Sequence, residues 1–184
     1  MSKSDFDEFV KRQQAEQQAA VTFDPKEELD KWLDYLDALY KEISSYLQTY
    51  IDSRAAQIDY RNVPLNEEFI GAYEARQMIL KIGRSTVTFT PIGTMLIGMK
   101  GRVDVQGPSG RATLFLVNKK ATSARSLIKV TISRPGNPPP PSPSAEAVQQ
   151  IRWVWKIGTS PPEMKFIELT QEAFFEMILE VANA

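Results

Sequence analysis

Hydrophobic residues between positions 29 and 50 recur at alternating intervals of three and four residues, which places them on one face of an α-helix. Asp24 and Pro25 are typical of a helix cap and of the first helical position, and Glu27 completes a capping box. Continued to residues 54–58, this helix would be about 45–50 Å long at ~1.5 Å per residue. Its apolar face consists of Leu29, Trp32, Leu36, Leu39, Ile43, Tyr46 and Tyr50.

From Gln77 onward the hydrophobic period changes to two, which is typical of half-buried β-strands. Residues 77–83 and 86–93 flank a short turn and predict a β-hairpin. Short apolar or alternating runs between turn-forming residues predict further strands. These runs lie at residues 94–105, 111–118, 127–134, 151–158 and 164–169.

Residues 170–184 return to helical spacing, with Thr170 as the expected N-cap and with Phe174, Ile178 and Val181 on one side. The order of a helix, a run of strands and a helix is typical of α+β proteins, whereas alternating strands and helices would indicate a parallel sheet. The sequence therefore predicts an α+β fold. Its parts are a long N-terminal helix, an antiparallel β-meander of about six to seven strands and a short C-terminal helix.

Residues 23–184 are predicted to form a single domain. Between the long helix and the hairpin, Asn66 could cap a short helix that runs to Ala75, although Gly71 would weaken it. Residues 1–22 have no continuous apolar face. We expect them to form an N-terminal tail that is weakly ordered or depends on a partner for its order.

The proline-rich stretch at residues 135–144 separates two predicted strands and does not mark a change in composition. Its prolines favour an extended polyproline II conformation and cannot donate to a sheet. Arg134 lies four residues before Pro138, one position away from the spacing that a ligand of an SH3 domain would have. The stretch is therefore interpreted as a rigid surface loop between two strands, and docking to an aromatic groove is the alternative.

The composition limits the chemistry that the chain can carry out. It has no cysteine and no histidine, so disulfides, thiolate nucleophiles and histidine general bases are excluded. We expect no cofactor and no metal, and an enzyme with a carboxylate site is the third of the functions considered. No apolar run approaches the length of a membrane span, and the first residues do not resemble a signal peptide. The expected location is cytoplasmic, without a membrane partner.

Charge is distributed unevenly along the chain. Residues 1–75 carry 16 acidic and 8 basic side chains, whereas residues 76–134 carry 11 basic side chains and one acidic side chain, Asp104. This asymmetry indicates either a polyanion-binding surface or an acidic helix that lies against basic strands. The candidate anion-binding residues are Lys100, Arg102, Arg111, Lys119, Lys120 and Arg125. Trp153 and Trp155 share a strand face that could stack on bases, but we interpret this face as core.

The function that these patterns favour is that of a soluble, non-catalytic binding or scaffold protein that acts through protein–protein contacts. The long helix exceeds the width of one small sheet, so its apolar face is predicted to drive self-association into a homo-oligomer. The alternative is nucleic-acid or other polyanion binding by the basic strands of residues 76–134.

Overall fold

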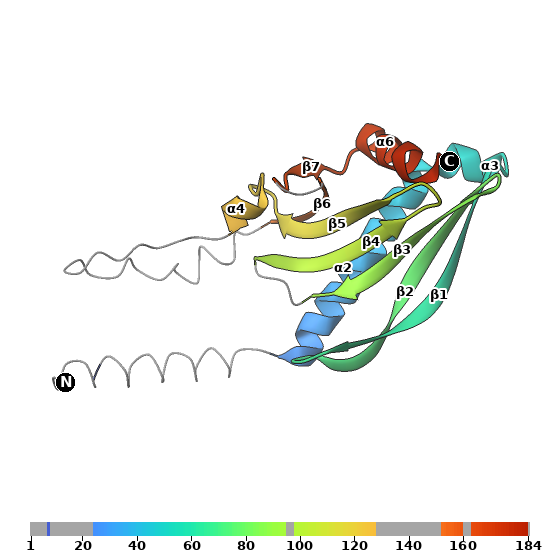
Figure 1. Ribbon diagram of the computed structural model, residues 1–184. Coiled ribbons are helices and arrows are strands. Elements are labelled where there is room, and N and C mark those ends of the chain that lie inside the picture. Colours follow the sequence, from blue (N-terminus) through green and yellow to red (C-terminus); the bar gives the residue numbers. More distant parts are fainter. Residues whose placement is uncertain (1–6, 8–23, 95–97, 128–151, 160–162, 184) are drawn as a thin grey trace.

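The structure is a computed structural model that describes residue 7 and residues 24–94, 98–127, 152–159 and 163–183. Within these residues the fold is α+β, as predicted: a long helix, α2, is followed by seven antiparallel strands and a C-terminal helix, α6. The strands form one sheet in chain order, from β1 to β7. Helix α2 crosses one face of the curved sheet, and α6 lies near the C-terminal end of α2 (Figure 1).

The strands are β1 (Ala56–Glu67), β2 (Gly71–Ile82), β3 (Ser85–Gly93), β4 (Met99–Gln106), β5 (Arg111–Asn118), β6 (Trp153–Gly158) and β7 (Phe166–Glu168). The helices are α2 (Pro25–Tyr46), α3 (Gln48–Asp52), α4 (Ala124–Leu127) and α6 (Gln171–Ala182). The predicted hairpin is confirmed as β2 and β3, which pair from Ile82 and Ser85 onward. Within the described residues, no helix combines the length and the apolar character needed to cross a membrane.

Helix α2 begins as predicted but ends earlier. The carboxylate of Asp24 accepts hydrogen bonds from the backbone N–H groups of Lys26 and Glu27, and the helix stops at Tyr46 because Leu47 leaves the helical conformation with ψ near 0°. A helix of 22 residues is about 33 Å long, so the predicted continuation to residues 54–58 is wrong. The interruption follows two serines whose hydroxyls bond to backbone carbonyls of the preceding turn, which is known to bend helices.

The short helix considered from Asn66 to Ala75 is also absent, because these residues form the end of β1, the turn at residues 68–70 and the start of β2. Gly71 has a φ of 89°, which glycine adopts without strain, and it begins β2 directly after the turn. Strand β1 was not predicted. Its polar residues and its proline obscure the alternation that identifies a strand, and both features are typical of a strand at the edge of a sheet.

A large hydrophobic cluster fills the space between the sheet and the two long helices. Trp32 on α2 and Phe174 on α6 are both buried in it, and Phe174 stacks on Phe89 of β3 with ring centroids 6.4 Å apart. Gly101 lets β4 approach α2, because a Cβ atom at this position would lie 2.1 Å from a ring carbon of Trp32. The packing of this cluster therefore depends on one small residue in β4 as well as on the large ones.

The C-terminal helix and the tryptophan face of β6 agree with the sequence analysis. The Thr170 hydroxyl caps α6 by accepting a hydrogen bond from the N–H of Ala173, and Trp155 is buried with its ring N–H donating to the carbonyl of Tyr35. Trp153 packs against the same cluster and is half-buried. The tryptophan face is core, as we interpreted it.

Three predicted segments fall outside the described residues. The N-terminal tail at residues 1–22 does so except for residue 7, and the proline-rich loop at 135–144 does so entirely. The strand predicted at residues 127–134 also lies outside, apart from Leu127, which ends α4.

Candidate functional site

The face of α2 that was predicted to self-associate lies against the chain's own sheet. Four of its members are almost fully buried, and Leu29 and Tyr46 pack against the same cluster. Tyr50 belongs to α3, where it is 48% exposed and contacts the edge of Phe175. The buried members are Trp32, Leu36, Leu39 and Ile43. Self-association through this face stays a prediction, but these four side chains have almost no exposed surface to offer a second chain.

The acidic and basic parts of the chain are partly matched within the molecule, as one of the two interpretations of the charge asymmetry predicted. Three ion pairs connect the acidic first part to the basic strands. They are Glu28–Lys100, Asp37–Arg76 and Asp59–Lys81. Burial raises the pKa of Glu28, but the hydrogen bonds and charges of Lys100 and Lys31 together lower it by more, so the pKa lies below its ordinary value. Part of the positive charge is therefore neutralised by the fold itself.

The six candidate anion-binding residues do not converge on one surface. Lys100 lies 3.0 Å from the carboxylate of Glu28 and 5.6 Å from the ring centre of Trp153. Arg102 makes two hydrogen bonds to the carboxylate of Asp104, so its charge is also matched. Arg111 begins β5 at the end opposite to Asn118. The remaining three candidates, Lys119, Lys120 and Arg125, follow β5 closely in the chain.

Four exposed cations lie on the segments that follow β5 and precede β7. We call this group the basic corner, and it consists of Lys119, Lys120, Arg125 and Lys165. An antiparallel bridge between Ser123 and Lys165 brings the last of these beside the others. In the part of the chain that the structure describes, the charged groups of the basic corner make no ion pair, in contrast to those of Lys100 and Arg102.

The buried side chain of Lys156 on β6 holds the backbone of the basic corner through hydrogen bonds. It is 3% exposed, and its ammonium donates hydrogen bonds to the carbonyls of Lys119 and Ala121 at 2.9 and 2.8 Å. The N–H of Lys119 in turn donates to the carbonyl of Arg152. A buried ammonium needs such acceptors because it has lost its water. The loop that carries Lys119 and Lys120 is therefore held at three points.

Helix α4 is anchored by a second set of hydrogen bonds. The hydroxyl of Ser126 accepts from the backbone N–H groups of Thr122 and Ser123 and donates to the carbonyl of Ser123. The N–H of Ala124 donates to the carbonyl of Met164, and the N–H of Phe166 donates to the carbonyl of Thr122. The segment before Arg125 is thus tied both to itself and to the segment before β7.

A small hydrophobic cluster on the opposite face of the sheet from α2 supports this region. Phe115 and Phe166 meet in an edge-to-face contact with centroids 5.7 Å apart, and Val117 and Ala121 complete the buried part of the cluster. Phe115 lies between Leu114 and Leu116 on β5, which belong to the large cluster, so strand alternation places the two clusters on different faces.

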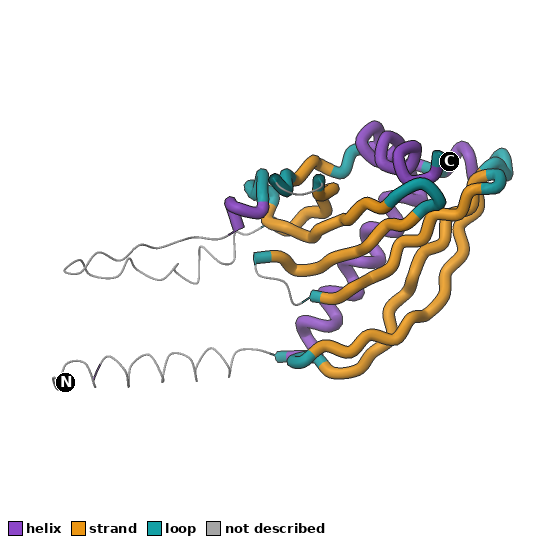
Figure 2. Tube along the Cα trace, in the orientation of Figure 1, coloured by secondary structure: helices purple, strands orange, loops and turns teal. Residues whose placement is uncertain are grey.

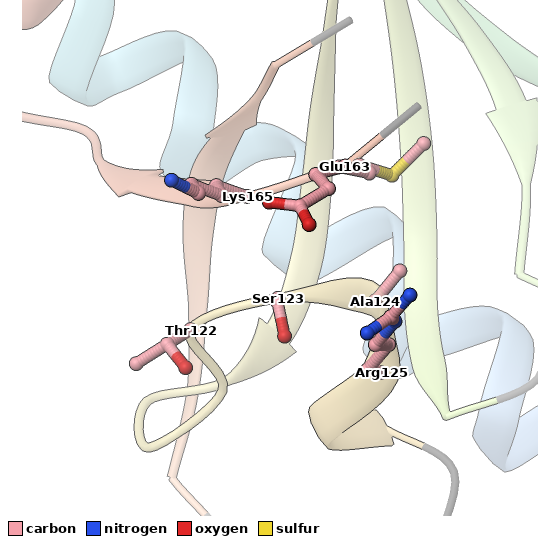
Figure 3. Close-up of a pocket in the computed structure, with 7 residues that line it drawn as sticks. Thr122, Ser123, Ala124, Arg125, Glu163 and Lys165 are labelled. Carbon is pink, nitrogen blue, oxygen red and sulfur yellow. The ribbon is translucent and has the colours of Figure 1, made fainter. Parts of the chain in front are cut away.

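A pocket with a volume of about 410 Å³ opens beside the basic corner. Figure 3 shows Thr122, Ser123 and Arg125 on one side of it and Glu163 and Lys165 on the other. Its remaining lining residues are Ala124 and Met164. The lining residues carry one guanidinium, one ammonium, two hydroxyl groups and one carboxylate, and the ammonium of Lys165 points away from Arg125 (Figure 3). These groups suit a ligand that carries negative charge and donor groups.

The hydrogen bonding of the two serines in this region describes which groups their hydroxyls contact. A serine nucleophile requires an adjacent base, and within the described residues the hydroxyls of Ser123 and Ser126 form no hydrogen bond to a lysine or a carboxylate. Among the described residues, no group of acidic side chains is arranged to hold a metal ion.

Comparison of the chain with models of protein families, with curated proteins and with solved structures gives no match. The interpretation of the site therefore rests on its residues and their geometry.

Two residues of this region were not singled out from the sequence. Lys165 lies far along the chain from Lys120, and their segments adjoin through the pairing of β5, β6 and β7 and the bridge between Ser123 and Lys165. Lys156 alternates with Trp155 and Ile157 and therefore has the position of a solvent-facing residue. The neighbouring sequence does not indicate that Lys156 is buried, because the residues that bury it belong to the loop after β5.

Proposed function

We propose that this chain is a non-catalytic binding protein whose basic corner binds an acidic segment of a protein partner. The observation that carries the proposal is that four exposed cations, which make no ion pair in the described structure, lie on adjoining segments, two of them lining a pocket with hydroxyl groups. Hydrogen bonds and a small hydrophobic cluster hold the backbone of this region. A preformed site of this kind loses little entropy when a ligand binds.

Three features favour an acidic peptide segment over a nucleic acid. A nucleic-acid surface needs cations along a continuous path, whereas Lys100 and Arg102 are matched by carboxylates. The pocket includes Glu163, whose carboxylate can accept hydrogen bonds from peptide N–H groups, which a nucleic-acid backbone does not have. The large exposed aromatic residues of the described structure, Tyr50, Tyr60 and Phe69, lie on other elements, so the corner has no platform for stacking bases.

The test is fluorescence anisotropy with a labelled peptide rich in Asp and Glu. The double variant K119Q/R125Q should bind the peptide at least about 10-fold more weakly, which corresponds to ~1.4 kcal/mol. The matched control R84Q/R111Q removes the same charge from exposed positions at the other end of the sheet, and its affinity should stay near that of the wild type. Affinity should also fall with added salt, because the site is exposed.

Two results would contradict the proposal. Equal losses in the two double variants would show that net charge, and not the basic corner, determines binding. Tighter binding of an oligonucleotide than of the acidic peptide at physiological salt would favour the polyanion alternative. Its salt dependence would then report how many phosphates the protein contacts.

A further inference from the structure

Strand β1 forms a long edge of the sheet. It pairs with β2 along 12 residues, and no described segment forms a backbone hydrogen bond with its other side. Three successive residues, Tyr60, Arg61 and Asn62, are exposed, so both faces of the strand reach solvent at its centre. Figure 2 shows β1 along the outer side of the sheet. A free edge of this kind offers unpaired N–H and C=O groups to another strand.

The hydrogen bonding of Tyr40 shows which residues of β1 direct their backbone groups outward. Its hydroxyl donates to the carbonyl of Arg76 on β2 at 2.6 Å and lies 3.4 Å from the carbonyl of Phe89 on β3. The carbonyl of Arg76 therefore faces β3. Asn62 is opposite Arg76 in the register, so its own N–H and C=O face away from β2.

The alternation of an antiparallel strand extends this assignment to Ile58, Tyr60 and Pro64, which lie an even number of residues from Asn62. Pro64 agrees with it independently. A proline has no N–H, and within a sheet it occurs where the missing donor would face the free edge. Residues 58, 60 and 62 thus present a row of unpaired backbone groups.

The side chains of Asp59 and Arg61, which lie between these residues, have opposite charges, so two antiparallel copies of β1 can be complementary in charge. When two copies of β1 run antiparallel with Tyr60 opposite Tyr60, Asp59 of each copy lies opposite Arg61 of the other. The two adjacent registers that keep outward-facing residues opposite each other place Asp59 against Asp59 or Arg61 against Arg61. Opposite charges across a strand pair are favourable and like charges are unfavourable, so this edge selects one register.

We propose that β1 pairs with β1 of a second copy of this chain, antiparallel and about a twofold axis at Tyr60. The pairing joins the two sheets into one continuous sheet with about six backbone hydrogen bonds between the copies. The rings of the two Tyr60 residues lie side by side at the axis, as a cross-strand aromatic pair. A second copy supplies both charges in the required order, which is why we assign the partner strand to the chain itself.

This proposal is independent of the basic corner, which lies beyond the other edge of the sheet near β7. It also gives self-association a surface other than the face of α2. In their own chain, Asp59 is bonded to Lys81 and Arg61 to Gln77. Both side chains nonetheless keep an exposed part, so each can meet a charge on an adjoining strand.

The first experiment is chemical crosslinking of two single-cysteine variants, which is simple because the chain has no cysteine. In Y60C the two cysteines lie opposite each other, with Cα atoms about 5.5 Å apart. In the control Q57C, each cysteine lies opposite Val63 of the other copy and about 20 Å from its equivalent. A short bismaleimide should crosslink Y60C into a dimer and leave Q57C mostly monomeric. Equal crosslinking of both variants, or none of Y60C, contradicts the proposal.

The second experiment exchanges charges and measures the mass by sedimentation. D59R and R61D should each weaken self-association by at least about 10-fold, because like charges then face each other in the dimer. An equimolar mixture of the two variants should regain the dimer, since each variant supplies the charges that the other lacks. A folded, monomeric wild type at the highest concentration tested would overturn the proposal, and so would a mixture that stays monomeric while both variants are folded.

Discussion

The two hydrophobic clusters of this protein differ in what they hold in place. The large cluster lies between the sheet and α2 and α6, and it determines how the helices cover the sheet. The small cluster, with Phe115, Val117, Ala121 and Phe166, lies on the other face and supports the basic corner. This difference indicates that the stability of the fold and the geometry of the candidate site are controlled separately. Equivalent substitutions in the two clusters should therefore have different consequences.

The largest effect is expected for Phe174→Ala in the large cluster. Phe174 is fully buried and contacts Phe89, Tyr46 and Phe175. Removing a buried ring leaves a cavity, and the free energy of unfolding should fall by about 3–5 kcal/mol. Urea denaturation measures this loss. The control Leu179→Ala, at an exposed position on the same helix, should change stability by less than about 0.5 kcal/mol. A similar loss in both variants would mean that α6 is not anchored through Phe174.

The same substitution in the small cluster, Phe166→Ala, should have a smaller global effect and a larger local one. Phe166 is 7% exposed and lies on the short edge strand β7, where its neighbours can shift to fill space. We expect a loss of about 2–3 kcal/mol. Hydrogen exchange in residues 119–126 should become faster, and binding of the acidic peptide should weaken. The control is Ile167→Ala at the adjacent exposed position. Unchanged exchange in residues 119–126 would show that the small cluster does not support the corner.

Lys156→Met should make the backbone of the basic corner more mobile, although Lys156 is buried and not one of its exposed cations. The substitution leaves the carbonyls of Lys119 and Ala121 without their donor, while removal of a buried charge offsets part of the cost. The net loss of stability should be about 1–2 kcal/mol. Peptide affinity should fall together with faster hydrogen exchange of the loop after β5, whereas Lys41→Met, at an exposed position on α2, should change neither. Wild-type peptide affinity in Lys156→Met would show that the buried ammonium is not needed for binding at the basic corner.

The smallest effect is a loss of stability at alkaline pH that originates in the large cluster. Burial raises the pKa of the Tyr40 hydroxyl far above its ordinary value of 10.0, and burial with the hydrogen bond to Glu67 raises that of Tyr73. Above pH 10 the unfolded chain loses these protons while the folded chain keeps them. Stability is therefore full below pH 10 and falls as the pH rises. Unfolding curves between pH 8 and 11, compared with those of Tyr40→Phe, should show a shallower decline in the variant. Equal slopes would contradict this assignment.

Those parts of the fold that depend on neighbouring residues were predictable from the sequence. The caps at Asp24 and Thr170 and the hairpin of β2 and β3 depend on short-range patterns, and all three are present. The end of α2 and strand β1 were not predictable in this way. The serine hydroxyls that precede Leu47 compete with the helix locally, and the charged edge of β1 has little hydrophobic alternation to detect.

The candidate site was predictable only as a set of cations. Lys119, Lys120 and Arg125 were named from charge, but nothing in the sequence separates them from Lys100 and Arg102, which the fold neutralises. That separation depends on which carboxylates α2 and β4 bring near each lysine or arginine. The contribution of Lys165 depends on the bridge to Ser123, a contact between segments far apart in the chain.

The most direct test of the proposed function is an NMR titration of the isotope-labelled chain with the acidic peptide. The account predicts that the amide signals of Lys119, Lys120, Thr122–Arg125 and Lys165 shift first, and that those of α2 and of β1 stay in place. It also predicts that the shifts are lost in K119Q/R125Q and kept in R84Q/R111Q. Shifts centred on the outer faces of β3 and β4, or spread evenly over the basic residues, would contradict the assignment of the site to the basic corner.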